Sequence, residues 1–257
     1  MERAFQVDLR GVVDLLGHHL YASPRVYLRE LLQNAVDAIT ARQLAGLAAG
    51  AAVLIEPPEV TGDGTLRVSD TGIGLTEPEV HELLATIGRS SKRDDLGFSR
   101  HEFLGQFGIG LLSCFLVADE VQVLTRSARG GASVQWTGYS NGRYLVEPAQ
   151  RERSEPGTTV MLKPRADMEH WLAANTVTEL ATNFGALLPV DISLAGRRAN
   201  SGVVPWLAGY PSPVERRAAL VGYAERLFGF TPFDVIDLEV SAAGLTGVAF
   251  VPPILEI

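Results

Sequence analysis

The chain has 257 residues, of which 46% are hydrophobic and 20% are charged, a balance typical of a globular protein with a sizeable core. Its formal net charge is −8 and its basic residues are spread along the chain, which argues against a nucleic-acid-binding surface. No apolar run approaches the roughly 20 residues that a membrane-spanning helix needs. Because Cys114 is the only cysteine, no disulfide can form within the chain, and we expect a cytoplasmic protein. From the charge distribution and the short apolar runs, we expect it to bind neither nucleic acid nor membrane.

The first strong helix signal is the stretch SPRVYLRELLQNAVDAI, residues 23–39. Ser23 is a favourable N-cap, the proline after it suits the first helical position, and apolar residues then recur at spacings of three and four. Glu30, Asn34 and Asp37 fall on one face of this helix. Two carboxylates and an amide with no lysine or arginine on the same face are unusual for a solvent-exposed helix, so the pattern indicates a binding site.

Two strands are predicted next, over 52–56 and 65–69, and the second leads directly into DTGIG (70–74). A carboxylate at a strand end followed by two glycines can form a binding site, although the same pattern also closes many ordinary turns. Thr76 and Glu79 then form a capping-box pair for a helix over 77–86.

Residues 87–104 are polar and charged without a clear period, which predicts a long loop of the kind that often serves as a lid. The glycine-rich stretch GQFGIG (105–110) follows, and the apolar residues 111–117 predict a buried helix. Glycines just before a helix leave backbone N–H groups free to bind an anion such as phosphate, but a tight turn for close packing uses the same residues.

The rest of the chain is rich in strands. We expect a leading helix over 5–20, an antiparallel meander of strands over 121–126, 132–136, 143–146 and 159–162, a closing helix over 169–187 and a strand over 190–194. Helices early and strands late predict an α+β two-layer sandwich, with helices packed on a mostly antiparallel sheet. Residues 196–213 are predicted as a linker. A helix over 214–228 and a hairpin over 235–240 and 245–251 then begin a second domain.

Taken together, these blocks resemble the GHKL ATPase superfamily, and more closely the N-terminal domain of HtpG-type heat-shock protein 90 chaperones. The blocks that match in order and spacing are LRELLQNAVDA (28–38), DTGIGL (70–75), ATIGRSS (85–91), LGQFGIGLLSCFLVADEV (104–121) and GTTV (157–160). The resemblance covers residues 1 to about 195. It implies a Bergerat-type ATP-binding domain over 1–195 and the truncated start of a middle domain over 214–257.

The resemblance also assigns roles to individual residues. It implies that Glu30 is the general base that activates water and that Asn34 is the Mg²⁺ ligand. The residues implied for the adenine pocket are Asp70, which accepts the adenine amino group, and Gly72, Gly74, Thr158 and Asp37 around it. The residues implied to bind the phosphates through backbone N–H groups are Gln106, Phe107, Gly108, Ile109 and Gly110.

The function implied is that of an ATP- and ADP-binding, Mg²⁺-dependent ATPase domain of a chaperone that acts on client proteins and is a homodimer at full length. The family arginine that completes the γ-phosphate contacts lies beyond Ile257, so slow hydrolysis is expected here. The alternative is a regulatory GHKL module that binds nucleotide with little or no turnover. A sensor kinase fits less well because the residues before Ser23 leave little room for a phosphoacceptor helix, and DNA-acting relatives fit less well because the chain is acidic.

Overall fold

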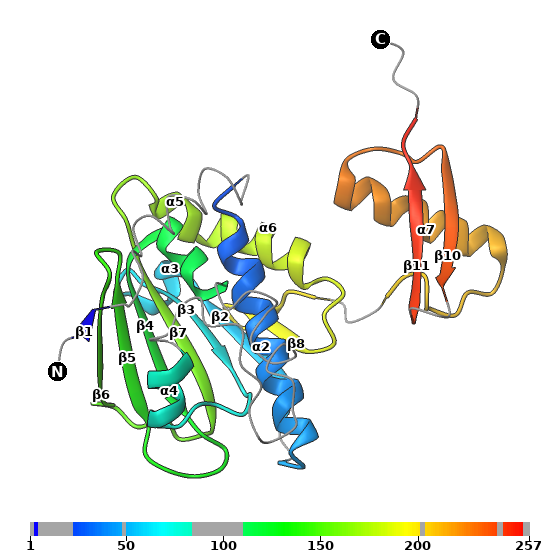
Figure 1. Ribbon diagram of the computed structural model, residues 1–257. Coiled ribbons are helices and arrows are strands. Elements are labelled where there is room, and N and C mark those ends of the chain that lie inside the picture. The colour runs from blue at the N-terminus through cyan, green and yellow to red at the C-terminus, as the bar shows by residue number, and fades with distance from the viewer. Residues whose placement is uncertain are drawn as a thin grey trace. The chain divides into compact units, whose positions relative to one another are not determined.

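The computed structural model describes residues 3–4, 23–47, 50–83, 110–200, 204–240 and 244–253. The chain divides into two compact units, Met1–Ser201 and Gly202–Ile257 (Figure 1). The predicted leading helix over 5–20 and the predicted lid over 87–104 lie outside the described residues.

The first unit is built on a nine-stranded sheet with the order β1-β6-β5-β4-β7-β3-β2-β8-β9. Its strands are β1 (Arg3–Ala4), β2 (Ala52–Glu56), β3 (Leu66–Asp70), β4 (Ala118–Arg126), β5 (Val134–Tyr139), β6 (Arg143–Pro148), β7 (Gly157–Pro164), β8 (Asp191–Leu194) and β9 (Arg197–Arg198). The strands pair antiparallel except for β2 and β8, which run parallel. The predicted fold class, helices packed on a mostly antiparallel sheet, is confirmed.

The strand order corrects the predicted meander. β4, β5 and β6 follow one another as expected, but β7 does not continue beyond β6. It lies between β4 and β3, where Val160 faces Val123 on one side and Val68 on the other. This central position places Val160 against the core, whereas an edge position would leave β7 with only one partner strand.

Helices cover one face of the sheet (Figure 1). The long helix α2 (Val26–Leu44) contacts β2, β3, the 3-10 helix η3 (Gly110–Leu116) and α6 (Ala174–Gly185). The shorter α4 (Glu77–Leu83) contacts β5, and α5 (Glu169–Leu172) contacts α6. The core fills the space between these helices and the sheet, and its largest fully buried side chains include Trp136, Tyr27 and Phe115.

Three predicted helices differ in detail. α2 begins at Val26, because the Ser23 hydroxyl accepts a weak hydrogen bond from the Arg25 N–H (3.4 Å) in a preceding turn and does not cap the helix. The helix predicted over 111–117 is the 3-10 helix η3, which spans Gly110–Leu116. The predicted helix over 169–187 is two helices, because Ala173 has extended backbone (φ −64°, ψ 147°).

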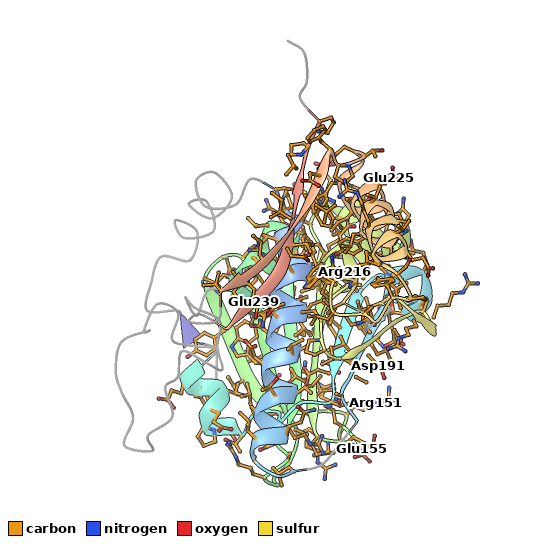
Figure 2. All side chains as sticks on the ribbon, turned by 90° about the vertical axis from the view of Figure 1, so that its right-hand side faces the viewer. Arg151, Glu155, Asp191, Arg216, Glu225 and Glu239 are labelled. Carbon is orange, nitrogen blue, oxygen red and sulfur yellow. The ribbon has the colours of Figure 1, made fainter. Side chains whose placement is uncertain are left out.

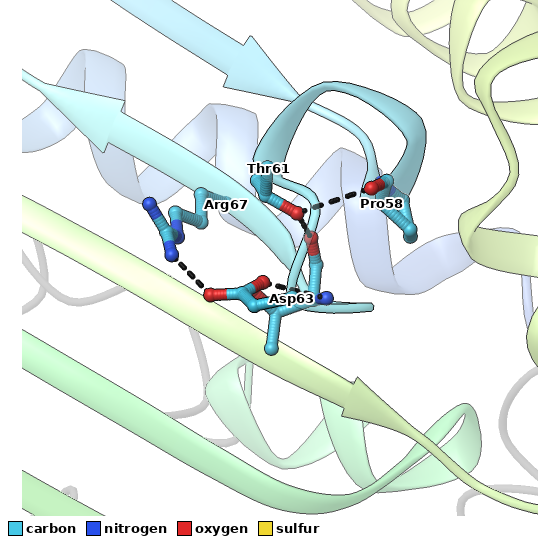
Figure 3. Close-up of polar contacts among 5 residues, drawn as sticks. Pro58, Thr61, Asp63 and Arg67 are labelled. Atoms are coloured by element: carbon cyan, nitrogen blue, oxygen red, sulfur yellow. Dashed lines mark hydrogen bonds and ion pairs between the residues drawn. The ribbon is translucent and has the colours of Figure 1, made fainter.

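The connection between β2 and β3 contains more than a simple turn. It contains a single helical turn, α3 (Pro58–Thr61), and the Thr61 hydroxyl donates to the carbonyl oxygen of Thr65 (2.8 Å). The Asp63 carboxylate accepts from the hydroxyl (2.6 Å) and the N–H (3.1 Å) of Thr65 and pairs with Arg67 (Figure 3). These contacts, above all the Thr65 hydroxyl, lower the pKa of Asp63.

The second unit consists of α7 (Pro213–Phe228) and the antiparallel pair β10 (Asp234–Val240) and β11 (Leu245–Val251). Ser212 caps α7 by accepting from the Glu215 N–H (3.2 Å), and the proline at the first position fits this start. Phe250 of β11 packs against Tyr223 and Phe228 of α7, with ring centroids 6.1 and 5.8 Å apart.

Part of the segment predicted as a linker, 196–213, pairs with residues of the first unit. β9 belongs to the sheet of the first unit, and the buried Asn200 side chain accepts from the Ile192 N–H (3.1 Å) and donates to the Val190 carbonyl oxygen (2.8 Å). These contacts tie the chain to the first unit up to residue 200.

Among the described residues, no helix combines the length and apolarity that crossing a bilayer requires.

Candidate functional site

The site is organised around Asp70, the last residue of β3. Alternation along this strand points Leu66, Val68 and Asp70 toward the helices, and all three are buried. Asp70 therefore places a carboxylate in an otherwise apolar row, with 9% of its surface exposed. A buried carboxylate needs hydrogen-bond donors to remain stable there.

Two backbone N–H groups donate to one oxygen of this carboxylate. The Asp70 Oδ1 accepts from Gly72 at 2.7 Å and from Thr158 at 3.2 Å. The described residues provide no hydrogen-bond donor to Oδ2. Burial raises the pKa of Asp70 to about 6, although the Gly72 N–H, the Arg153 charge and the Thr158 N–H each lower it.

The glycines of the DTGIG turn permit close packing. A Cβ added to Gly72 would lie 2.5 Å from the Cβ of Ala38 in α2, and the Ile73 N–H donates to the Ala38 carbonyl oxygen at 2.9 Å. Gly74 has φ +64°, and its added Cβ would lie 1.9 Å from the carbonyl oxygen of Arg126. The turn can therefore approach α2 and the end of β4 only with glycine at these two positions.

Thr158, which we expected beside the adenine base, lies next to Asp70. It contacts Thr125, a residue that the sequence analysis did not single out. The hydroxyls of Thr158 and Thr125 are 3.1 Å apart, and the Thr125 hydroxyl accepts from the Leu75 N–H at 2.9 Å. Thr125 is fully buried. A threonine at an inward position of a strand carries no local signal of such a role.

Glu30 and Asn34 lie together at the first residue of η3. A Cβ added to Gly110 would lie 2.9 Å from the Glu30 Oε2 and 3.6 Å from the Asn34 Nδ2. The other Glu30 oxygen accepts from Arg29 at 2.9 Å. Within the described part of the chain, no hydrogen bond involves the Asn34 side-chain amide. The structure thus brings two predicted site residues of α2 to the end of the glycine-rich stretch.

Asp37 lies on the same helix, next to Ala38. It accepts from the Gln33 side chain at 2.8 Å, and its partial burial raises its pKa. Ala38 comes eight positions after Glu30, which is about 12 Å along a helix axis. One helix therefore connects a group of polar residues at Gly110 with the buried carboxylate at the end of β3.

Cys114 is buried beside this site. Burial raises the pKa of its thiol, and the negative charge of Glu30 raises it further. The cysteine is therefore a neutral core residue, as the apolar run around it predicts.

The four predicted phosphate-binding residues before Gly110, namely Gln106, Phe107, Gly108 and Ile109, lie outside the described residues. In the part of the chain that the structure describes, no three His, Cys, Asp or Glu side chains gather as candidate metal ligands. A metal at Asn34 would therefore need oxygens from a bound ligand and water to complete its coordination.

Comparison with known proteins places the chain in a family. Residues 21–161 match the model of the histidine kinase-, DNA gyrase B- and HSP90-like ATPase family, and the chain belongs to this family. The resemblance to GHKL ATPases is thereby confirmed.

Within this family, the chain is similar to HtpG and related heat shock proteins. The chain is 34% identical over 205 residues to the chaperone protein HtpG of Methylobacterium sp. (strain 4-46), covering 74% of this chain and 33% of that protein. It is 33% identical over 206 residues to HtpG of Myxococcus xanthus, covering 74% and 31%. It is 30% identical over 213 residues to the mitochondrial heat shock protein 75 kDa of Rattus norvegicus, covering 79% and 30%. The chain thus spans about a third of the length of these relatives.

Proposed function

We propose that this chain is the N-terminal, ATP-binding and ATP-hydrolysing part of an HtpG-type chaperone. The family membership and the likeness to HtpG proteins support the proposal. The single observation that carries the proposal is the buried Asp70 carboxylate. The turn that follows Asp70 packs against α2, the helix that carries Glu30 and Asn34.

Asp70 suits the recognition of adenine. Its Oδ1 is committed to the N–H groups of Gly72 and Thr158, and Oδ2 has no donor among the described residues. An amino group is the natural partner for such an oxygen, because it can donate a hydrogen bond to the acceptor that the described residues leave open. The exocyclic amino group of adenine would supply this donor, with Thr158 and the glycine turn beside it.

The residues at Gly110 suit the phosphates. Asn34 offers an amide oxygen, a ligand type that Mg²⁺ accepts, and Gly110 leaves room where any Cβ would approach Glu30. A bound Mg²⁺ would neutralise charge on phosphate oxygens during hydrolysis. Its ligand from this chain would be Asn34.

Glu30 would act as general base. Arg29 orients the carboxylate by binding Oε1, and Oε2 points toward Gly110. A carboxylate held in this way can orient a water molecule and accept its proton. A module that only binds nucleotide has no need of a base at this position.

Further parts of the proposal concern the longer protein. The HtpG relatives are chaperones, and the matched part of this chain covers only about a third of their length. We therefore propose client proteins as partners of the whole protein, a homodimer as its assembly and the cytoplasm as its location.

Comparing ADP with GDP by isothermal titration calorimetry tests the proposal on this chain. ADP should bind and GDP should not, because guanine presents a carbonyl oxygen where adenine presents its amino group, and an oxygen facing Asp70 is repelled. Equal affinity for the two nucleotides, or no binding of either in the presence of Mg²⁺, would contradict the proposed function.

A further inference from the structure

Arg153 lies in the connection between β6 and β7, and its backbone is anchored on both sides. Its N–H donates to the Ser133 hydroxyl at 2.9 Å, and its carbonyl oxygen accepts from the Arg126 guanidinium at 2.7 Å. Figure 2 labels its neighbours Arg151 and Glu155 in the same connection. These bonds determine where the Arg153 side chain can reach.

The Arg153 guanidinium binds three acceptors, which lie at the end of β3, in the connection before β7 and near the start of β7. It donates to the carbonyl oxygen of Asp70 at 3.1 Å, to the carbonyl oxygen of Glu155 at 3.2 Å and to the Thr159 hydroxyl. A Cβ added to Gly157 would lie 2.1 Å from the Asp70 carbonyl oxygen and 3.0 Å from the Arg153 Nη2. Gly157 thus allows the guanidinium to reach Asp70.

The charges of the two residues influence each other. Burial raises the pKa of Asp70, and the positive charge of Arg153 opposes this rise. Burial likewise lowers the pKa of Arg153, and the negative charge of Asp70 opposes that fall. The two side chains form no direct ion pair, so Arg153 acts on the carboxylate through its position at the Asp70 backbone.

The other charged groups around this strand end have different partners. Arg42 of α2 donates to the carbonyl oxygen of Thr71 at 3.0 Å, and Arg126 of β4 donates to the carbonyl oxygens of Arg153 and Ser154. Asp37 of α2 is engaged by Gln33. Within the described ranges, Arg153 is the cation that contacts Asp70 itself.

We propose that Arg153 is a positioning residue of the candidate site: it holds Asp70 at the strand end and keeps its carboxyl group ionised at neutral pH, so that adenine nucleotide is still bound in mildly acidic solution. The nucleotide part of this inference rests on the proposed function, and the effect on Asp70 does not.

Two measurements test the inference. The first is NMR titration of ¹³C-labelled aspartate in the ligand-free chain, with the Asp70 signal assigned from Asp70→Asn. The second is calorimetric titration with ADP at pH 6.0 and pH 8.5. Both use the parent, Arg153→Gln, which removes the charge, Arg153→Lys, which keeps the charge but not the three-acceptor geometry, and Arg151→Gln, which removes an exposed charge from the same connection.

We expect Asp70 to titrate near 6 in the parent and in Arg151→Gln, and at higher pH in Arg153→Gln. If the pKa of Asp70 rises by about one, its ionised fraction at pH 6.0 falls from about one half to about one tenth, so ADP affinity should fall about fivefold at pH 6.0 and hardly at all at pH 8.5. Arg153→Lys should keep the parental pH dependence, because the charge remains.

An Asp70 titration that is the same in Arg153→Gln as in the parent would overturn the inference. So would an equal loss of affinity at both pH values, because a purely structural role predicts no pH dependence. If Arg153→Gln does not fold, an Asp70 titration in Arg153→Lys far above that of the parent decides against it. If the parent binds no ADP at any pH, the proposed function fails, while the NMR titration still decides the effect of Arg153.

Discussion

Asp70→Asn should make the protein more stable at neutral pH, although it removes the residue assigned to nucleotide recognition. The pKa of Asp70 is raised by burial from 3.8 to about 6. This rise in pKa corresponds to a destabilisation of about 3 kcal/mol when the carboxyl group is ionised, because a difference of one in pKa is worth about 1.36 kcal/mol. Asparagine keeps an oxygen that can accept from the N–H groups of Gly72 and Thr158 and brings no charge into the site.

The sign of the pH dependence follows from proton linkage. Because the folded pKa of Asp70 lies above the unfolded value, the folded protein binds a proton first as the pH falls. Ionised Asp70 therefore destabilises the fold fully above about pH 6, and this destabilisation disappears as the pH falls from 6 toward 3.8. The gain from Asp70→Asn should be largest at about pH 8 and vanish near pH 4.

Denaturant unfolding of the parent and Asp70→Asn, measured at several pH values, provides the assay. At pH 8 the free energy of unfolding should be about 3 kcal/mol higher for Asp70→Asn than for the parent. Asp63→Asn is the matched control, because the same change of charge falls on a carboxylate whose pKa is lowered by Thr65 and Arg67. That variant should lose stability at neutral pH, and the loss should shrink as acid protonates Asp63 in the parent. An Asp70→Asn protein that is less stable than the parent at pH 8 would refute the reasoning.

Other changes should separate binding, turnover and packing. In the longer protein, Glu30→Ala should keep ADP affinity within a few-fold and reduce ATP turnover by roughly 10²- to 10⁴-fold, as steady-state hydrolysis would show; unchanged turnover would leave only the nucleotide-binding alternative. Asn34→Ala should lose the Mg²⁺-dependent part of the affinity in paired titrations with and without Mg²⁺. Gly74→Ala should destabilise the fold far more than Gly64→Ala. Both glycines have positive φ, but only Gly74 has neighbours within 4 Å of the added Cβ. Equal denaturation midpoints for the two variants would contradict the packing around Gly74.

Strand positions could be predicted from the sequence more readily than strand neighbours. The predicted strand over 52–56 coincides with β2, the one over 245–251 coincides with β11, and the one over 235–240 differs from β10 by a single residue. The insertion of β7 between β4 and β3, and the parallel pairing of β8 with β2, depend on contacts between residues far apart in the chain. Local periodicity contains no information about such pairings.

In the candidate site, too, local sequence patterns single out some residues, whereas others reach the site only through contacts between distant parts of the chain. Glu30 and Asn34 could be found because a single helix places them at a regular spacing, and Asp70 because it ends a strand before glycines. Arg153 could not, because it comes from a polar connection and reaches Asp70 across 83 residues of sequence. Thr125 could not be predicted as a site residue for a similar reason, since its partners Leu75 and Thr158 are distant in the chain.

Titration of ADP with Mg²⁺ into the parent chain and into Asp70→Asn, at pH 8 where Asp70 is ionised, tests the central claim most directly. The account predicts clear binding by the parent and none by a variant that is folded and at least as stable, because the change removes the acceptor for the adenine amino group and little packing. Binding of ADP by Asp70→Asn with the parental affinity would contradict the assignment of the base pocket.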